Sequence, residues 1–271
     1  MSGTLAFSSL SDAQLSRRDK LVLLGTLAAV IGLAWAYLVL SMTHMNTASA
    51  HHAAMGMAVP WTATHVALTL LMWIVMMVAM MLPSATPMML TYATVASRIA
   101  PSQHQRLSVS LFATGYIIVW SGFSLGATLL QWSLERAALL SPEIVASSTL
   151  LGGTLLITAG VYQWSPAKEF CLKQCRSPLS FIASNWRPGH DGALRMGIQH
   201  GAFCLGCCWA LMLLLFVGGV MNLLWVAFIS IFVLLEKLMG AGTRAGRWIS
   251  GGGLITAGAF AVAMEYLSKV N

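Results

Sequence analysis

The sequence predicts an all-α membrane protein, a polytopic bundle of about seven transmembrane helices. Three observations lead to this prediction: 58% of the 271 residues are hydrophobic, only 8% are charged, and long apolar runs recur along the chain. Soluble domains carry roughly a quarter charged residues, whereas a run of about 20 apolar residues can cross a bilayer as a helix. The composition excludes a soluble globular domain, a disordered chain and most nucleic-acid-binding proteins.

A short cytosolic arm, residues 1–20, precedes a single transmembrane domain, residues 21–271. Pro83 and Pro87 are expected to end or kink the second span, because proline breaks the helical hydrogen-bond ladder. Glycines separate the fifth and sixth spans, which should form a tight hairpin. The predicted spans lie near residues 21–41, 62–82, 107–130, 144–163, 197–217, 221–235 and 248–267.

The basic residues fall on alternate loops. Thirteen of the 15 lysines and arginines lie in the N-terminal arm and in the loops after the second, fourth and sixth spans, against only Arg136 and Lys269 on the other side. Cytoplasmic loops carry such an excess, so we expect a bacterial inner (cytoplasmic) membrane, with the N-terminus inside and the C-terminus outside. The first span is longer than a usual signal peptide and is expected to be retained. Cleavage after Ala50 would instead leave His51 as a copper-chelating N-terminus.

The fifth predicted span carries the most specific motif, GIQHGAFCLGCCW. His200, Cys204 and Cys208 are four residues apart and share one face of a helix, with Cys207 beside them. Thiolate and imidazole ligands select Cu(I), Zn(II) or iron–sulfur clusters. A single cysteine in such a helix is usually a small packing residue, but four such side chains on one stripe predict a metal site.

A second pair, Cys171 and Cys175, precedes this motif on the cytosolic side, also one helical turn apart. The pair could share a metal with the fifth span. Alternatively, Lys168, Lys173 and Arg176 could lower the thiol pKa values and create a reactive cysteine, or the pair could be inert.

Methionines form a ladder in the second span. Thioether sulfur is a soft, uncharged ligand that suits Cu(I), although methionine also fills gaps in helix packing. Counted from the inner ends of their spans, Met76 and Cys204 are expected at similar depths. The predicted ladder consists of Met72, Met76, Met77 and Met80.

The loop expected outside the membrane, residues 42–61, is rich in histidine and methionine and has no charged residue. These side chains can bind Cu(II) and Cu(I) respectively, so we interpret the loop as a metal-capture segment rather than a simple polar linker. The candidate residues are His44, His51, His52, Met55 and Met57, with His65 opening the next helix.

Glu236, near the inner end of the sixth span, is a candidate for ion or proton coupling, since acids in membrane segments are usually functional. Snorkelling to the interface is the simpler interpretation. The sequence lacks a phosphate-binding glycine loop, a G-x-S-x-G elbow and an H-E-x-x-H motif. No enzymatic activity is therefore predicted.

The sequence resembles an uncharacterised bacterial family of predicted metal-binding integral membrane proteins. The resemblance lies in WIVMMVAMMLPSATPMM, GYIIVW, GVYQWSPAKEFCLKQCRSPLSF and the stretch from GIQHGAFCLGCCW to the Glu-Lys pair, at residues 73–89, 115–120, 160–181 and 197–237. It implies a helical membrane fold and a metal site, but no established activity, substrate or metal.

Together these features predict a membrane protein that binds a soft transition metal, with copper as the best fit and zinc as the alternative. Its role would be metal transport, delivery or insertion into a membrane enzyme, and its partners the lipid bilayer, the ion and a metalloenzyme or metallochaperone. The two rivals are a membrane thiol–disulfide oxidoreductase and a structural or assembly subunit of a membrane complex.

Overall fold

A computed structural model describes residues 16–54, 61–99, 105–140, 148–238 and 244–270. Nearly all of the described chain is helical, which confirms the predicted all-α class. The helices are α2 (Arg17–Ala54), α3 (Ala63–Ile99), α4 (Gln105–Arg136), α5 (Thr149–Gln163), α6 (Pro166–Arg176), α7 (Pro178–Asn185), α8 (Gly189–Leu213), α9 (Leu215–Gly218), α10 (Leu223–Leu238) and α11 (Arg244–Val270).

Each of the seven predicted spans coincides with a helix, but several helices are longer than predicted. The expected outer loop is partly wrong, because α2 continues to Ala54. The backbone at His44, His51 and His52 is therefore helical, while their side chains, together with Met55 and Met57, lie outside the described part of the chain.

Helix α3 continues through Pro83 and Pro87 rather than ending there. Proline supplies no backbone N–H, so nearby carbonyls need other donors. Two side-chain hydroxyls near the prolines bond to the backbone of the same helix: Ser84 donates to the Met81 carbonyl at 2.9 Å and Thr86 to the Leu82 carbonyl at 3.1 Å. The residues on both sides of the two prolines therefore belong to one continuous helix.

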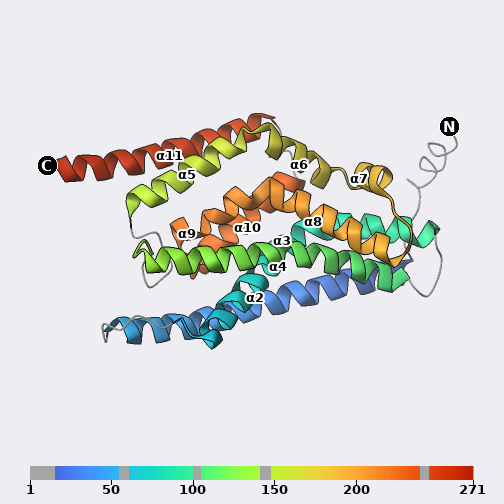
Figure 1. The fold of residues 1–271 in the computed structure, drawn as a ribbon. Helices are drawn as coiled ribbons and strands as arrows, with labels where there is room; N and C mark the ends of the chain where they lie inside the picture. The colour runs from blue at the N-terminus through green and yellow to red at the C-terminus, as the bar shows by residue number, and fades with distance from the viewer. Residues whose placement is uncertain (1–15, 55–60, 100–104, 141–147, 239–243, 271) are drawn as a thin grey trace.

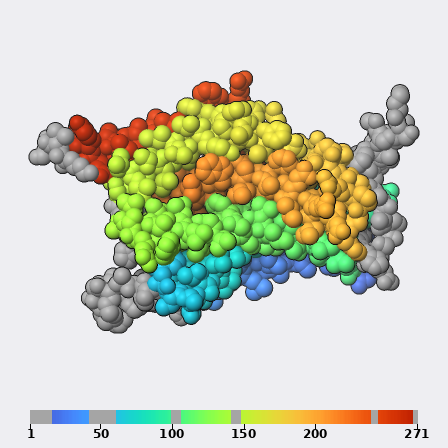
Figure 2. Space-filling model, in the orientation of Figure 1, coloured from blue at the N-terminus to red at the C-terminus, as the bar shows by residue number. Residues whose placement is uncertain are grey.

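Helices α3, α4 and α8 form the centre of the bundle, with α2 on one side and the α5–α11 pair on the other (Figures 1 and 2). Glycines permit the close crossing of α4 and α8. A Cβ at Gly197 would collide with the carbonyl oxygen of Phe112, and one at Gly115 with that of Leu194. This crossing fixes the position of the cysteines on α8 relative to α4.

The predicted hairpin between the fifth and sixth spans is present. Helix α9 ends in a turn at Gly219, whose φ of 93° favours glycine. The indole N–H of Trp225 then donates to the Leu214 carbonyl at 2.7 Å and fixes the start of α10 against the end of α8.

Four helical stretches are long and apolar enough to cross a membrane: residues 17–41, 63–98, 106–136 and 189–218. Within the described residues, α5 and α10 are shorter, with 15 and 16 residues. The protein is therefore compatible with membrane association, while the count of seven crossings stays a prediction.

Candidate metal centre

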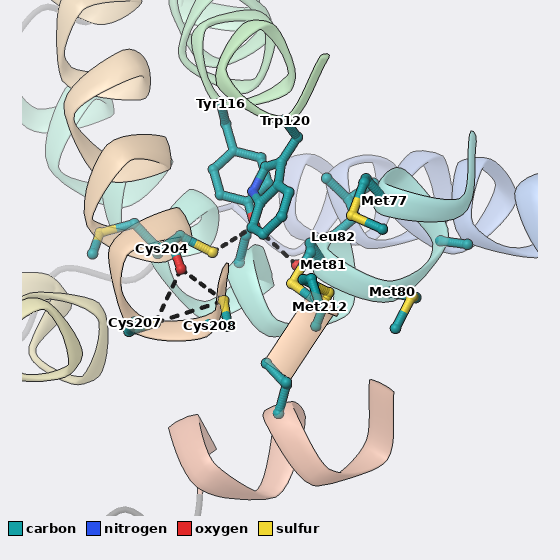
Figure 3. Close-up of a cluster of buried hydrophobic side chains, with 14 of the residues drawn as sticks. Met77, Met80, Met81, Leu82, Tyr116, Trp120, Cys204, Cys207, Cys208 and Met212 are labelled. Carbon is teal, nitrogen blue, oxygen red and sulfur yellow. Dashed lines mark hydrogen bonds between the residues drawn. The ribbon is translucent and has the colours of Figure 1, made fainter. Parts of the chain in front are cut away.

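Three cysteines of α8, Cys204, Cys207 and Cys208, are buried at the middle of the bundle. The thiols of Cys207 and Cys208 turn back along their own helix and donate to the Cys204 carbonyl at 3.1 and 2.7 Å. The two sulfur atoms lie 3.8 Å apart. Figure 3 shows these contacts on one turn of α8, as the helical spacing in the sequence predicts.

The Cys204 sulfur points away from that turn and contacts two other helices. The Tyr116 hydroxyl of α4 lies 3.0 Å from it, and the Lys237 ammonium of α10 lies 2.9 Å from it. The Tyr116 hydroxyl also donates to the Met81 carbonyl of α3 at 3.2 Å. Tyr116 therefore connects Cys204 to α3 at Met81, while the expected match in depth between Cys204 and Met76 stays a prediction.

Lys237 is buried and donates to the Ser84 hydroxyl of α3 at 3.1 Å as well as to Cys204. The adjacent residue, Glu236, turns elsewhere and forms a 2.8 Å salt bridge with Lys168 of α6. Both members of that pair are almost completely buried. Glu236 thus does not snorkel to an interface. Within the described part of the chain, its Oε1 has no hydrogen-bond partner.

Helix α6 brings the second cysteine pair to α8. Its first turn is capped by Ser165, whose hydroxyl accepts from the Lys168 N–H at 3.1 Å. The Cys175 thiol lies near the thiols of Cys204 and Cys207. Cys171 packs against the backbone of Gly206, where a Cβ would lie 2.7 Å from its sulfur. The two cysteine groups therefore meet in space.

The interpretation of Cys171 and Cys175 as activated thiols is wrong. Hydrogen bonds with Cys204 and Cys207, together with burial, raise the pKa of Cys175 well above its ordinary value. Burial, and then the nearby Cys207, raises the pKa of Cys171. Two of the neighbouring cations already have carboxylate partners, since Lys168 pairs with Glu236, and Lys173 with Glu169 at 3.3 Å.

His200 lies one turn before Cys204, buried among aromatic rings. Its ring is 5.5 Å from that of Tyr116, 5.6 Å from Phe181 and 6.0 Å from Phe112, measured between centroids. Its Nδ1 has no hydrogen-bond partner among the residues that the structure describes. A buried imidazole nitrogen without a partner is available to a ligand or to a rotated neighbour.

The predicted methionine ladder faces the interior of the bundle. Met72, Met76, Met77 and Met80 are all buried in the core that also contains the cysteines. Figure 3 shows Met77, Met80 and Met81 of α3 and Met212 of α8 with the three cysteines in one cluster. Burial of the ladder agrees both with a thioether route and with ordinary core packing.

At the far end of α3, His65 is half-buried and its ring packs edge-on against Trp61, with centroids 5.0 Å apart. Of the six predicted outer capture residues, it is the one whose side chain the structure describes.

In the described part of the chain, no group of three or more His, Cys, Asp or Glu side chains is arranged to hold a metal ion. The thiols do not converge on one point. Those of Cys207 and Cys208 donate to the Cys204 carbonyl, and the Cys204 sulfur contacts the Lys237 ammonium group. Cys175 and Cys204 nevertheless approach each other from two helices. Such a sulfur pair suits Cu(I), which accepts few, soft ligands, better than zinc, which takes four.

Sequence reasoning missed the side chains that surround Cys204. Lys237 could have been recognised as a charge at the end of an apolar helix, a position where charge is usually functional. Nothing in the sequence marks Tyr116 or Ser84, because a single hydroxyl in a helix has no distinctive pattern. Only the crossing of α3, α4, α8 and α10 brings these residues together.

Comparison with known proteins agrees with a copper-related function. No curated protein and no solved structure matches the chain. Residues 70–261 match the PpoB2 family, which is described as a copper chaperone. The matched region contains α4 to α10, all five cysteines and the four methionines of the ladder. Zinc has no such support. Since the match covers well over half of the sequence, the chain belongs to the PpoB2 copper chaperone family.

Proposed function

We propose that this protein is a membrane-embedded copper chaperone that holds Cu(I) as its cargo between thiols of α6 and α8. The observation that carries the proposal is the approach of Cys175 to Cys204 from separate helices. A ligand pair on two helices can open and close around an ion when the helices shift, which a pair within one helical turn cannot do. A chaperone needs this property because it must release its cargo.

Binding to the two thiols is a ligand exchange without electron transfer. One Cu(I) replaces two S–H protons, which leave to solvent, and a copper bis-thiolate with one negative charge remains. Cys207 and Cys208 can join by rotating their thiols away from the Cys204 carbonyl, to which they now donate at 3.1 and 2.7 Å. Cys171 and His200 lie next to this group and complete the proposed ligand set.

The buried methionines supply a route between the outer end of α3 and the cysteines. Thioethers bind Cu(I) weakly and without charge, so an ion can move from one to the next. We propose capture at His44, His51, His52, Met55, Met57 and His65, and passage along Met72, Met76, Met77 and Met80. The role would be transport, delivery or insertion of copper into a membrane enzyme.

We further propose a bacterial inner membrane and seven crossings with the N-terminus inside. Four helices of sufficient length and apolarity support this arrangement, as do the alternating directions of the successive long helices (Figure 1). Lys168, Lys237 and Arg247 are buried and no longer count as loop charges. The remaining basic residues still favour the same side, so the expected orientation stands as part of the proposal.

The test is copper analysis of protein purified anaerobically in detergent and reconstituted with Cu(I). We expect about one copper per wild-type chain, and loss of most of it in Cys175→Ser and in Cys204→Ser, since each would break the thiolate pair that joins α6 to α8. Gln174→Ser, which removes no proposed ligand, is the matched control on the same helix and should retain the ion. Circular dichroism shows that each variant is folded.

Unchanged copper in the Cys175→Ser/Cys204→Ser double variant would refute the assigned site. Absence of copper even from reconstituted wild type, with a mixed disulfide trapped at Cys171 or Cys175, would favour the thiol oxidoreductase instead. Loss of assembly of a partner complex without bound copper would favour the structural subunit.

A further inference from the structure

The ammonium group of Lys237 is a buried positive charge beside the thiols. Its hydrogen-bond partners are the Cys204 sulfur at 2.9 Å and the uncharged Ser84 hydroxyl at 3.1 Å. None of the salt bridges found within the described residues joins Lys237 to a carboxylate. The nearest acid along the chain, Glu236, already pairs with Lys168. Sulfur is thus the anionic group that this lysine can neutralise.

Charge in a dry interior must be balanced, because an unpaired charge there is very costly. A pair of thiolates holding Cu(I) carries one negative charge, which one ammonium group cancels. The same pair holding a divalent ion is already neutral, so the ammonium would be left without a counter-charge. A lysine at this position therefore favours a monovalent ion and disfavours a divalent ion.

The positions of Lys237 and Tyr116 around Cys204 also favour a monovalent ion. Lys237 and Tyr116 approach Cys204 from α10 and α4, at 2.9 and 3.0 Å from its sulfur. These two contacts occupy part of the space around the Cys204 sulfur and reduce the room for an ion that requires four ligands. Zinc in structural sites requires four ligands, whereas the arrangement leaves Cys204 open toward Cys175.

We propose that Lys237 is the specificity-determining residue of the centre, the counter-ion that selects monovalent copper over divalent metals. This inference rests on the proposed function, because it assumes that the thiols of Cys204 and Cys175 hold the ion. It assigns to Lys237 an effect on metal choice and not a role as a ligand.

The experiment compares Ag(I) and Cd(II), soft ions with the same electron configuration and different charge, alongside Cu(I) and Zn(II). Affinities are measured anaerobically, by competition with a chromophoric Cu(I) chelator and by the ultraviolet absorption of the cadmium–thiolate bond. The variants are Lys237→Met, similar in length but uncharged, and Lys237→Arg, which keeps the charge. We expect Lys237→Met to lower the preference for the monovalent ion by at least tenfold, and Lys237→Arg to restore most of it.

The matched control is Lys168→Met with Glu236→Gln, which removes the neighbouring buried ion pair without changing net charge. This double variant should keep the wild-type preference.

Lys237→Gln serves as a second neutral variant if Lys237→Met does not fold. A metal preference in the neutral variants within threefold of wild type, with copper still bound, would overturn the role of Lys237 and leave the proposed function intact. Failure of the wild type to bind Cu(I) would overturn both.

Discussion

The Lys237 ammonium nitrogen lies 2.9 Å from the Cys204 sulfur, deep between α10 and α8. A lysine and a cysteine 33 positions apart in the sequence thus form a buried polar contact between two helices. Because α10 also holds α6 through Glu236 and Lys168, the inner end of α10 organises both helices that carry cysteines.

Replacing Cys204 with alanine should destabilise the copper-free protein. Among the described residues, Lys237 would keep only the Ser84 hydroxyl as a partner, and leaving a buried charged group short of a hydrogen-bond partner costs about 3 kcal/mol. Thermal unfolding in detergent measures the change. Cys207→Ala, which removes only a thiol–carbonyl contact, should cost about 1 kcal/mol. Equal losses of stability in the two variants would show that the contact between Lys237 and Cys204 does not stabilise the protein.

Substitutions of Lys168 and Glu236, which form a buried ion pair, should have non-additive effects on the free energy of unfolding. Glu236→Gln leaves Lys168 as an uncompensated charge and should lower the free energy of unfolding by about 3–5 kcal/mol. Lys168→Met in the same chain should recover most of this loss, because no unpaired charge remains. A double-mutant cycle of unfolding free energies checks the coupling. Additive effects would mean that the 2.8 Å contact contributes little.

A methyl group at the crossing of α4 and α8 should be poorly tolerated. In Gly197→Ala the new Cβ would meet the Phe112 backbone, and overpacking typically costs about 1–3 kcal/mol. Gly122→Ala on α4 is the control, since nothing lies within 4 Å of its added Cβ. Gly197→Ala should lower the melting temperature in detergent, while Gly122→Ala should leave it unchanged or raise it slightly, because alanine favours the helix.

Cys171 should react slowly with iodoacetamide at neutral pH. Burial and the nearby Cys207 raise its thiol pKa, so the reactive thiolate forms only at more alkaline pH than in an exposed cysteine. The rate should still be rising with pH where a model thiol has levelled off. Cys207→Ser should shift the profile toward lower pH. Fast alkylation at neutral pH would restore the idea of an activated thiol.

Glu169 should make the attachment of α6 to α11 sensitive to acid. Hydrogen bonds from Arg247 at 2.8 Å and Lys173 at 3.3 Å lower the pKa of Glu169. A carboxyl whose pKa is lower in the folded state stabilises that state above its unfolded pKa, and the gain is lost as the pH falls through the folded pKa. Unfolding followed over the acidic range should show this loss in wild type and lack it in Glu169→Gln.

Much of the centre could be predicted from residue spacing. Cysteines three and four positions apart on an apolar helix must share a face, which placed Cys204, Cys207 and Cys208 on one turn. The burial of Met72, Met76, Met77 and Met80 follows from the same periodicity. The helical backbone near His44, His51 and His52 was missed, because a polar stretch without charge resembles a loop although it can extend a helix.

The sequence by itself determined the helical class, the seven apolar segments and the soft-ligand chemistry, because composition and periodicity are properties of single segments. The tertiary structure decided which segments meet. It linked Cys204 to Met81 through the Tyr116 hydroxyl, brought Cys175 near Cys204, and put Lys237 between α3 and α8. These contacts depend on how far each helix slides along its neighbour, which glycine crossings such as Gly197 against Phe112 fix and which no pattern within one helix can reveal.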